Sequence, residues 1–204
     1  MHTKCEFVQF TILRDTTRHT ILTVARIVFA HRGAENTTMD DLAKASGLGR
    51  RTIYTYFKTR EELYHEVIKR EIDIILKQLN RVAGMKISPE KKIVRFMVNH
   101  MKTIENLIRK DRILRTEFLR RSERIENFRI VIDTHEKECF ALILQEGTQS
   151  GIFLVDDCEN TASLAVTTLK GLERQFILDN FGKHCREMLE LWQKILFRGI
   201  KTSV

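Results

Sequence analysis

Apolar residues recur every three or four positions along most of this chain, which is the spacing that gives an α-helix one buried face. In 17–31, for example, Ile21, Ala25 and Phe29 share such a face, and Gly33 follows as a residue able to end the helix. The same spacing, together with helix-start signals, predicts further helices at 38–47, 50–57, 59–83, 89–107, 111–121, 123–149, 157–180 and 183–199. The pattern therefore predicts about nine helices.

Residues that interrupt helices are scarce, which supports this prediction. The chain has one proline, Pro89, and it follows Ser88 where a helix is expected to begin. The pairs Asn-Gly and Asp-Gly, which favour β-hairpins, do not occur in the sequence. We therefore predict an all-α fold, in which an N-terminal three-helix domain continues through a long fourth helix into a helical bundle.

Residues 39–58 have the pattern of a helix-turn-helix, in which two short helices cross closely around a tight turn. Ala43 is small where the helices would approach, and Gly47 can adopt the left-handed backbone that ends the first helix. Ile53 and Phe57, four positions apart, would anchor the second helix in the core. The alternative is an ordinary antiparallel helix pair with a solvated basic face, but the spacing and the acid-free face favour the helix-turn-helix.

The second short helix has a surface suited to nucleic acid. Between Lys44 and Arg60 there are five cations and no acid, so no carboxylate would repel phosphate. The sides away from the core carry Arg51, Thr52, Tyr54, Thr55 and Lys58, flanked by Arg50 and Tyr56. The whole chain has 35 Lys and Arg against 27 Asp and Glu, a net charge of +8, which agrees with a polyanionic partner without identifying one.

The sequence around this motif resembles the TetR-type family of transcription regulators. The resemblance covers about residues 17–66 and rests on the runs at 29–33, 38–43, 46–48, 52–58 and 60–63. The run Thr-Ile-Tyr-Thr-Tyr-Phe-Lys at 52–58, followed by Glu-Glu-Leu, is a specific combination. It implies a DNA-binding domain at 17–66 and a ligand-binding and dimerisation domain at 67–204.

Site roles follow by position within that family. Arg50, Arg51 and Thr52 are expected to meet base edges in the major groove. Phosphate contacts are expected from Tyr54, Tyr56 and Lys58, assisted by Thr38 and Arg60, and Thr55 lies on the same exposed side. The partner would be double-stranded operator DNA, palindromic or nearly so, because a two-fold symmetric dimer presents two recognition helices.

Three features depart from the family. Ala34 stands where an aromatic residue is usual, which predicts looser packing under the first helix, and Arg60 replaces a lysine with its charge kept. Residues 1–16 form an N-terminal extension that is longer than expected. The extension is interpreted as a strand-like or disordered arm or as an upstream start codon, with a minor-groove arm using Lys4 and Arg14 as the other reading.

The C-terminal domain, by the same resemblance, encloses a small-molecule effector and forms a homodimer through its last two helices, 157–180 and 183–199. The candidate ligand-binding residues interrupt apolar stripes: His100, His135, Cys139 and Thr168. For both histidines a core imidazole with a hydrogen-bond partner stays an alternative. No further ligand shares helical spacing with them, so we predict no metal site and no cofactor.

Catalytic motifs such as a nucleophile triad or a phosphate-binding glycine loop are absent from the sequence, and we predict that the protein is not an enzyme. The four cysteines form no close pair, and no apolar run reaches the length of a membrane span, so a cytoplasmic protein is expected. We expect a repressor released from its operator by a small molecule. A regulator controlled by a protein partner and an all-helical enzyme or metal-binding bundle are the alternatives.

Overall fold

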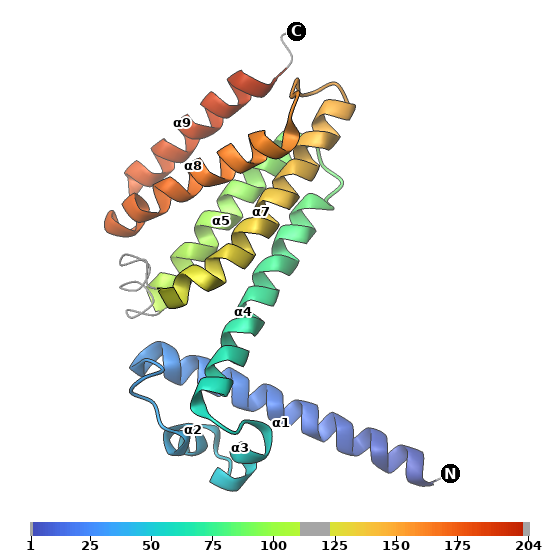
Figure 1. The fold of residues 1–204 in the computed structure, drawn as a ribbon, viewed down its shortest axis with the longest axis vertical. Helices are drawn as coiled ribbons and strands as arrows, with labels where there is room; N and C mark the ends of the chain where they lie inside the picture. Colours follow the sequence, from blue (N-terminus) through green and yellow to red (C-terminus); the bar gives the residue numbers. More distant parts are fainter. Residues whose placement is uncertain (1, 111–122, 202–204) are drawn as a thin grey trace. The chain divides into compact units, whose positions relative to one another are not determined.

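The computed structural model describes residues 2–110 and 123–201, and every named element in these ranges is a helix (Figure 1). In chain order these are α1 (His2–Arg32), α2 (Met39–Ser46), α3 (Arg50–Tyr56), α4 (Arg60–Ala83), α5 (Pro89–Lys110), α7 (Glu123–Gln149), α8 (Cys158–Leu178) and α9 (Lys183–Ile200). Within the described ranges the only β feature is an isolated bridge between Phe153 and Lys201. The predicted all-α fold is confirmed, and the helix expected at 111–121 lies outside the described residues.

The chain divides into two compact units, and the division falls after Glu71, inside α4. The N-terminal unit contains α1, α2, α3 and the first part of α4, and the C-terminal unit contains the rest of α4 with α5, α7, α8 and α9. Each unit has its own hydrophobic core. Among the described helices, none combines the length and the apolar character needed to cross a bilayer.

The core of the N-terminal unit takes one face from each of its helices. Ile21, Ala25 and Phe29 of α1 are buried, as their spacing predicted, together with Leu42 of α2 and Leu63 of α4. Ala34, the position that lacks the usual aromatic ring, is only partly buried against this cluster. The three-helix corner is thus stabilised by apolar burial from both sides of its turn.

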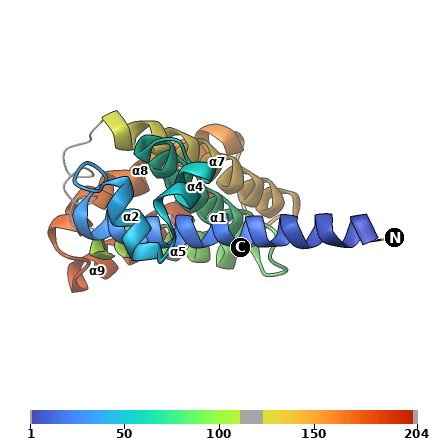
Figure 2. The ribbon, with the colours of Figure 1, turned by 90° about the horizontal axis from the view of Figure 1, so that it is seen from below.

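The first helix is longer than predicted. α1 runs without interruption from His2 to Arg32, whereas the sequence predicted a helix only from position 17 (Figure 2). The interpretation of residues 2–16 as strand-like or disordered was therefore wrong. No proline or glycine occurs between His2 and Arg32, so nothing in this stretch ends the helix before Gly33, whose φ of 81° allows the chain to turn.

In the C-terminal unit, α5, α7 and α8 pack against one another (Figure 1). α7 begins and ends as predicted, but the residues that share one face by helical spacing, such as Cys139, Leu142 and Glu146, are only partly buried. Leu142, placed on the inner face by its spacing, is 57% exposed, and Glu146 is also exposed. The buried positions include Glu136 and Phe140 as well as the expected Cys139. α7 contacts both α5 and α8, so its inner face is wider than one stripe and is rotated away from Leu142.

Candidate nucleic-acid interface and interior cavity

The start of α2 is fixed by a capping box. Thr38 is the N-cap: its hydroxyl oxygen accepts from the amide of Asp41 at 3.1 Å, and the Asp41 carboxylate accepts from the Thr38 amide at 2.9 Å. The Thr38 hydroxyl also donates to Asp41 Oδ2 at 2.7 Å. This bond and the one from the Thr38 amide, with a smaller contribution from the charge of Arg32, lower the pKa of Asp41. These contacts form a capping box, and the Thr38 side chain therefore already serves the helix start.

The turn after α2 has the predicted geometry. Gly47 adopts φ 66° and ψ 13°, the left-handed conformation, and ends the helix. The amide of Leu48 returns to the carbonyl of Ala43 at 3.2 Å, and the Leu48 side chain packs partly buried against the core of the N-terminal unit. The turn therefore fixes where α3 begins relative to the end of α2.

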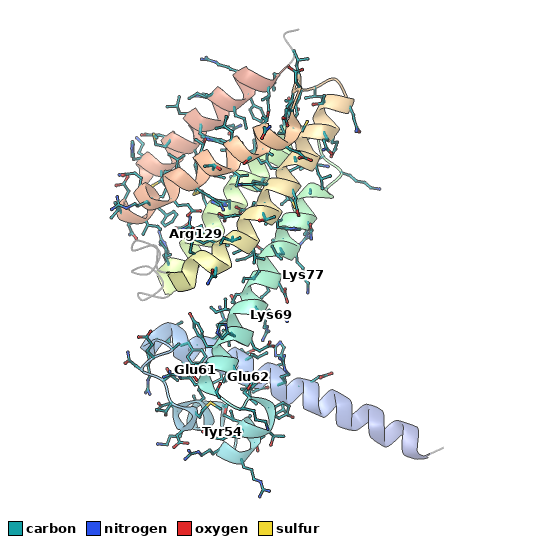
Figure 3. The ribbon with its side chains drawn as sticks, in the orientation of Figure 1. Tyr54, Glu61, Glu62, Lys69, Lys77 and Arg129 are labelled. Atoms are coloured by element: carbon teal, nitrogen blue, oxygen red, sulfur yellow. The ribbon has the colours of Figure 1, made fainter. Side chains whose placement is uncertain are left out.

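α3 has one buried and one exposed side. Ile53 is 0% exposed and Phe57, which follows the helix as its C-cap, is 1% exposed, which confirms both as anchors. Arg50, Arg51, Thr55 and Lys58 are exposed, and Thr52, Tyr54 and Tyr56 are half-buried. Figure 3 shows Tyr54 on α3, with Glu61 and Glu62 at the start of α4. Arg50, Arg51, Thr55 and Lys58 therefore lie on the exposed surface, whereas Tyr54 and Tyr56 also pack against the core of the N-terminal unit.

The cations of this surface differ in how firmly the protein holds them. Arg50 pairs with Asp40 of α2, Nε to Oδ1 3.0 Å, and its guanidinium lies 5.6 Å from the centre of the Tyr54 ring. Arg60 donates to the carbonyl of Glu35 at 2.8 Å and pairs with Glu61. Lys58 donates from Nζ to the carbonyl of Tyr54 at 3.2 Å.

Arg51 is different from these three. Its guanidinium has no hydrogen-bond or ion-pair partner in the part of the chain that the structure describes, and the side chain is exposed. Arg51 is therefore the arginine of α3 that can bind a base edge without first leaving a protein carboxylate. This distinction could not be drawn from the sequence, in which Arg50 and Arg51 are neighbours of the same type.

The C-terminal unit contains an interior cavity between α4, α5, α7 and α8. Its enclosed volume is about 40 Å³, and the wider hollow reaches about 520 Å³ only when open solvent at its mouth is counted. Its apolar lining comes from Ile75, Leu79, Ile104 and Ile132. Its charged lining comes from His100, Arg129, Asp133, Glu136, Lys170 and Glu173, of which Arg129 is marked on α7 in Figure 3. Such a hollow, largely apolar with a few polar groups, is typical of small-molecule sites.

His100 is the centre of this charged group. Its Nδ1 lies 2.6 Å from Glu136 Oε1, and its Nε2 lies 3.0 Å from Glu173 Oε1. Burial by itself would lower the pKa of the imidazole, but the charges and hydrogen bonds of the two carboxylates outweigh it and raise the pKa to about 9. His100 is therefore protonated at pH 7 and donates to both carboxylates.

The second carboxylate has a second cationic partner. Arg129 donates to Glu173 Oε2 at 2.7 Å, and the neighbouring Lys170 forms an ion pair with Asp133. Burial opposes ionisation of Glu173, but its hydrogen bond and charge contact with His100 hold the pKa of this carboxyl below its ordinary value. Burial lowers the pKa of Lys170 to about 8. At pH 7 three carboxylates and three cations therefore balance in the cavity wall.

Of the four predicted ligand-binding residues, His100 lines the cavity and the other three do not. His135 lies 3.0 Å from Asn80 Oδ1, and Cys139 is buried, with its pKa raised to about 11 mainly by that burial. Thr168 is exposed and donates to the carbonyl of Leu164 at 2.8 Å. Among the described residues no cluster of three His, Cys, Asp or Glu side chains could hold a metal ion.

Five charged residues of the cavity were missed from the sequence: Arg129, Asp133, Glu136, Lys170 and Glu173. A signal was present, because the first three follow one another at i, i+4 and i+7 on α7, and the last two at i and i+3 on α8. The same spacing occurs in exposed charged stripes, so it does not by itself reveal burial.

Comparison with known proteins bears directly on the N-terminal unit. Residues 21–67 match the family model described as bacterial regulatory proteins, tetR family. The HTH-type transcriptional repressor KstR2 of Mycolicibacterium smegmatis is 29% identical over 142 residues, 68% of this chain and 68% of that protein. The family match coincides with the helix-turn-helix that the geometry defines.

Two solved structures extend the likeness to the C-terminal unit. A transcriptional regulator of the TetR/AcrR family from Thermobifida fusca has 25% identity and a TM-score of 0.64, covering 89% of this chain and 97% of that one. FadR of Bacillus subtilis, solved in complex with stearoyl-CoA, has 20% identity and a TM-score of 0.63, covering 89% and 98%, and shares the fold. Residues 21–67 thus resemble the tetR family of bacterial regulatory proteins, and the chain as a whole shares the fold of a solved TetR/AcrR-family regulator.

Proposed function

We propose that the protein is a repressor that binds a palindromic operator as a homodimer and is released by a small molecule. The observation that carries the proposal is α3, which is anchored by Ile53 and Phe57 and presents to solvent Arg51, whose guanidinium has no partner among the described residues. An arginine donating two hydrogen bonds to guanine contributes about 1–3 kcal/mol of discrimination between bases. The relative named as a repressor, KstR2, supports the direction of regulation.

We assign the DNA contacts as the sequence predicted them. Arg51 reads base edges, assisted by Arg50 and Thr52. Tyr54, Thr55, Tyr56 and Lys58 lie along the phosphates, with Thr38 and Arg60 at the neighbouring helix starts. We assign the protein to the cytoplasm, where the operator DNA of a bacterial regulator lies.

Dimerisation is assigned to α8 and α9. Both helices expose large apolar side chains, with Leu164 and Leu178 on α8 and Leu191 and Ile195 on α9. An apolar face of this kind is stabilised when it is covered by a second copy. Two copies related by a two-fold axis would place their α3 helices about 34–36 Å apart, one turn of duplex DNA.

Release by a small molecule is assigned to the interior cavity of the C-terminal unit. The complex of FadR with stearoyl-CoA supports a ligand site in this fold. α4 contributes Ile75 and Leu79 to the cavity and also carries Leu63 in the N-terminal core, so one helix belongs to both units. A ligand must bind one conformation more tightly to release DNA, by about 5.5 kcal/mol for a shift from 1:99 to 99:1.

The test is selection of bound sites from random duplexes with the full chain. We expect a two-fold symmetric product whose half-sites lie one helical turn, or a multiple of it, apart. Equal affinity for the selected site and a scrambled duplex of the same length, measured by gel shift at the same salt, would contradict the proposal.

A further inference from the structure

Two buried polar atoms in the cavity wall, Glu136 Oε2 and Lys170 Nζ, have no hydrogen-bond partner among the described residues. The Glu136 side chain is 3% exposed, and its Oε1 is bound to His100, but its Oε2 has no hydrogen-bond partner among the described residues. An unsatisfied buried carboxylate oxygen is unfavourable, because it has lost water without gaining a donor. Glu136 lines the cavity, and although its Oε2 has almost no exposed surface, a molecule that enters and displaces the neighbouring side chains can supply that donor.

A donor with free capacity lies beside this oxygen. Lys170 Nζ is 3.8 Å from Glu136 Oε2 and is also buried. An ammonium carries three N–H groups, and the ion pair with Asp133 engages only part of them. The cavity therefore presents an available acceptor and an available donor next to each other.

The two groups together select the head group of a ligand. A ligand ammonium would satisfy Glu136 but be repelled by Lys170, and a ligand carboxylate would satisfy Lys170 but be repelled by Glu136. A hydroxyl accepts one hydrogen bond while donating another. One oxygen at about 2.8 Å from each atom bridges a gap of 3.8 Å.

The balance of charges in the cavity wall also favours a neutral ligand. Asp133, Glu136 and Glu173 carry three negative charges, and His100, Arg129 and Lys170 carry three positive charges at pH 7. A neutral ligand preserves this balance, whereas a charged one adds an uncompensated charge to a buried site.

We propose that the cavity binds an uncharged, hydroxyl-bearing apolar molecule, an alcohol or a phenol, whose hydroxyl donates to Glu136 Oε2 and accepts from Lys170 Nζ. The apolar body lies against Ile75 and Leu79 of α4, Ile104 of α5 and Ile132 of α7. This assignment rests on the proposed effector site and adds the chemical class of the ligand.

The test compares three probes with the same eight-carbon chain: n-octanol, octanoate and octylammonium. Binding to the full chain is measured by isothermal titration calorimetry at pH 7. We expect n-octanol to bind at least about tenfold more tightly than either charged probe, because burial of an unmatched charge is costly. Equal affinity for the three probes, or tighter binding of a charged one, would overturn the assignment and indicate that Glu136 Oε2 is satisfied by water.

A substitution at Glu136 tests the head group directly. Glu136→Gln keeps an oxygen for His100 but places an amide N–H₂ where Oε2 stood, so two donors then face the ligand. The preference should change from n-octanol to octanoate. Thr168→Ala, on the exposed side of α8, is the matched control and should leave all three affinities unchanged. Circular dichroism confirms that each variant is folded, and an unchanged order of affinities in a folded Glu136→Gln protein counts against the proposal.

The DNA measurement separates this inference from the proposed function. If n-octanol binds selectively but leaves operator affinity unchanged, the head-group assignment stands and the proposed release by a ligand in this cavity fails. If the three probes bind without preference while the wild-type protein retains sequence-specific DNA binding, the head-group assignment fails and the regulator assignment stands.

Discussion

The guanidinium of Arg50 is bound to the carboxylate of Asp40, 3.0 Å from Nε to Oδ1, and so links the first turn of α3 to the first turn of α2. Arg51, the next residue, has no such partner among the described residues. Two adjacent arginines of the candidate interface therefore differ in whether their guanidinium is already bound to a carboxylate of the protein. One is held by the protein, and the other is available to DNA.

The Asp40 link predicts a gain of function. Asp40→Asn should free Arg50 and remove a negative charge close to the phosphates, which raises affinity for operator and random duplexes alike. An exposed ion pair contributes up to about 1 kcal/mol, so we expect a gain of up to about fivefold at low salt that shrinks as salt is raised. Fluorescence anisotropy at several salt concentrations measures the gain in affinity and its dependence on salt. Asp73→Asn, which removes an equal charge from an exposed site in the C-terminal unit, is the control; an equal gain there would show that only net charge matters.

Arg51 and Lys58 should differ in the kind of binding that they support. Arg51→Ala should cost about 1–3 kcal/mol on the selected operator and little on random DNA, because a base contact is lost. Lys58→Ala should weaken both duplexes equally and reduce the slope of log K against log salt by about one. Gel-shift titrations on the two duplexes separate these outcomes. A uniform loss for Arg51→Ala would place this arginine on the phosphates.

The buried imidazole predicts a pH dependence of stability. The pKa of His100 is raised to about 9 in the folded protein from an ordinary 6.5, so folded chains keep a proton that unfolded chains lose. The contribution of protonated His100 to the stability of the folded protein is complete below pH 6.5 and is lost as pH rises toward 9. Lys170, with its pKa lowered to about 8, acts in the opposite direction from about pH 7 upward. The groups that face His100 are Glu136 and Glu173, with Arg129 paired to the latter.

The window from about pH 6.5 to 7 is therefore governed mainly by His100. The free energy of unfolding should fall by about 1 kcal/mol per pH unit there, as measured by urea denaturation. In a folded His100→Gln variant that share of the slope should vanish. Stability that rises over this window in the wild type, relative to the variant, would mean that the imidazole is neutral when folded.

The dimer assignment can be tested on the exposed leucines. Leu164 on α8 is 70% exposed and Ile195 on α9 is 63% exposed. Leu164→Glu or Ile195→Glu would place a charge inside the proposed interface. For each variant we expect monomers in analytical ultracentrifugation and a loss of operator binding. Val98→Glu, at an exposed apolar position of α5, should leave the dimer intact. A dimer that survives both substitutions would exclude α8 and α9 as the interface.

The helix-turn-helix could be predicted from the sequence because its determinants are local. A capping residue at Thr38, a left-handed glycine at Gly47 and two anchors four residues apart each act within a few positions of the chain. Most helix boundaries could be predicted from the sequence for the same reason. Residues 2–16 were the exception: without a proline or glycine to end it, the helix simply continues.

The cavity was decided by the tertiary structure alone. Arg129, Glu136 and Glu173 have the helical spacing of ordinary solvated charges, and only the packing of α5, α7 and α8 buries them around His100. The face of α7 that turns inward, with Leu142 outside, likewise depends on two neighbouring helices rather than on the helix itself. Periodicity shows that a helix has an inner face, but burial and pairing depend on partners distant in the chain, which the local pattern does not encode.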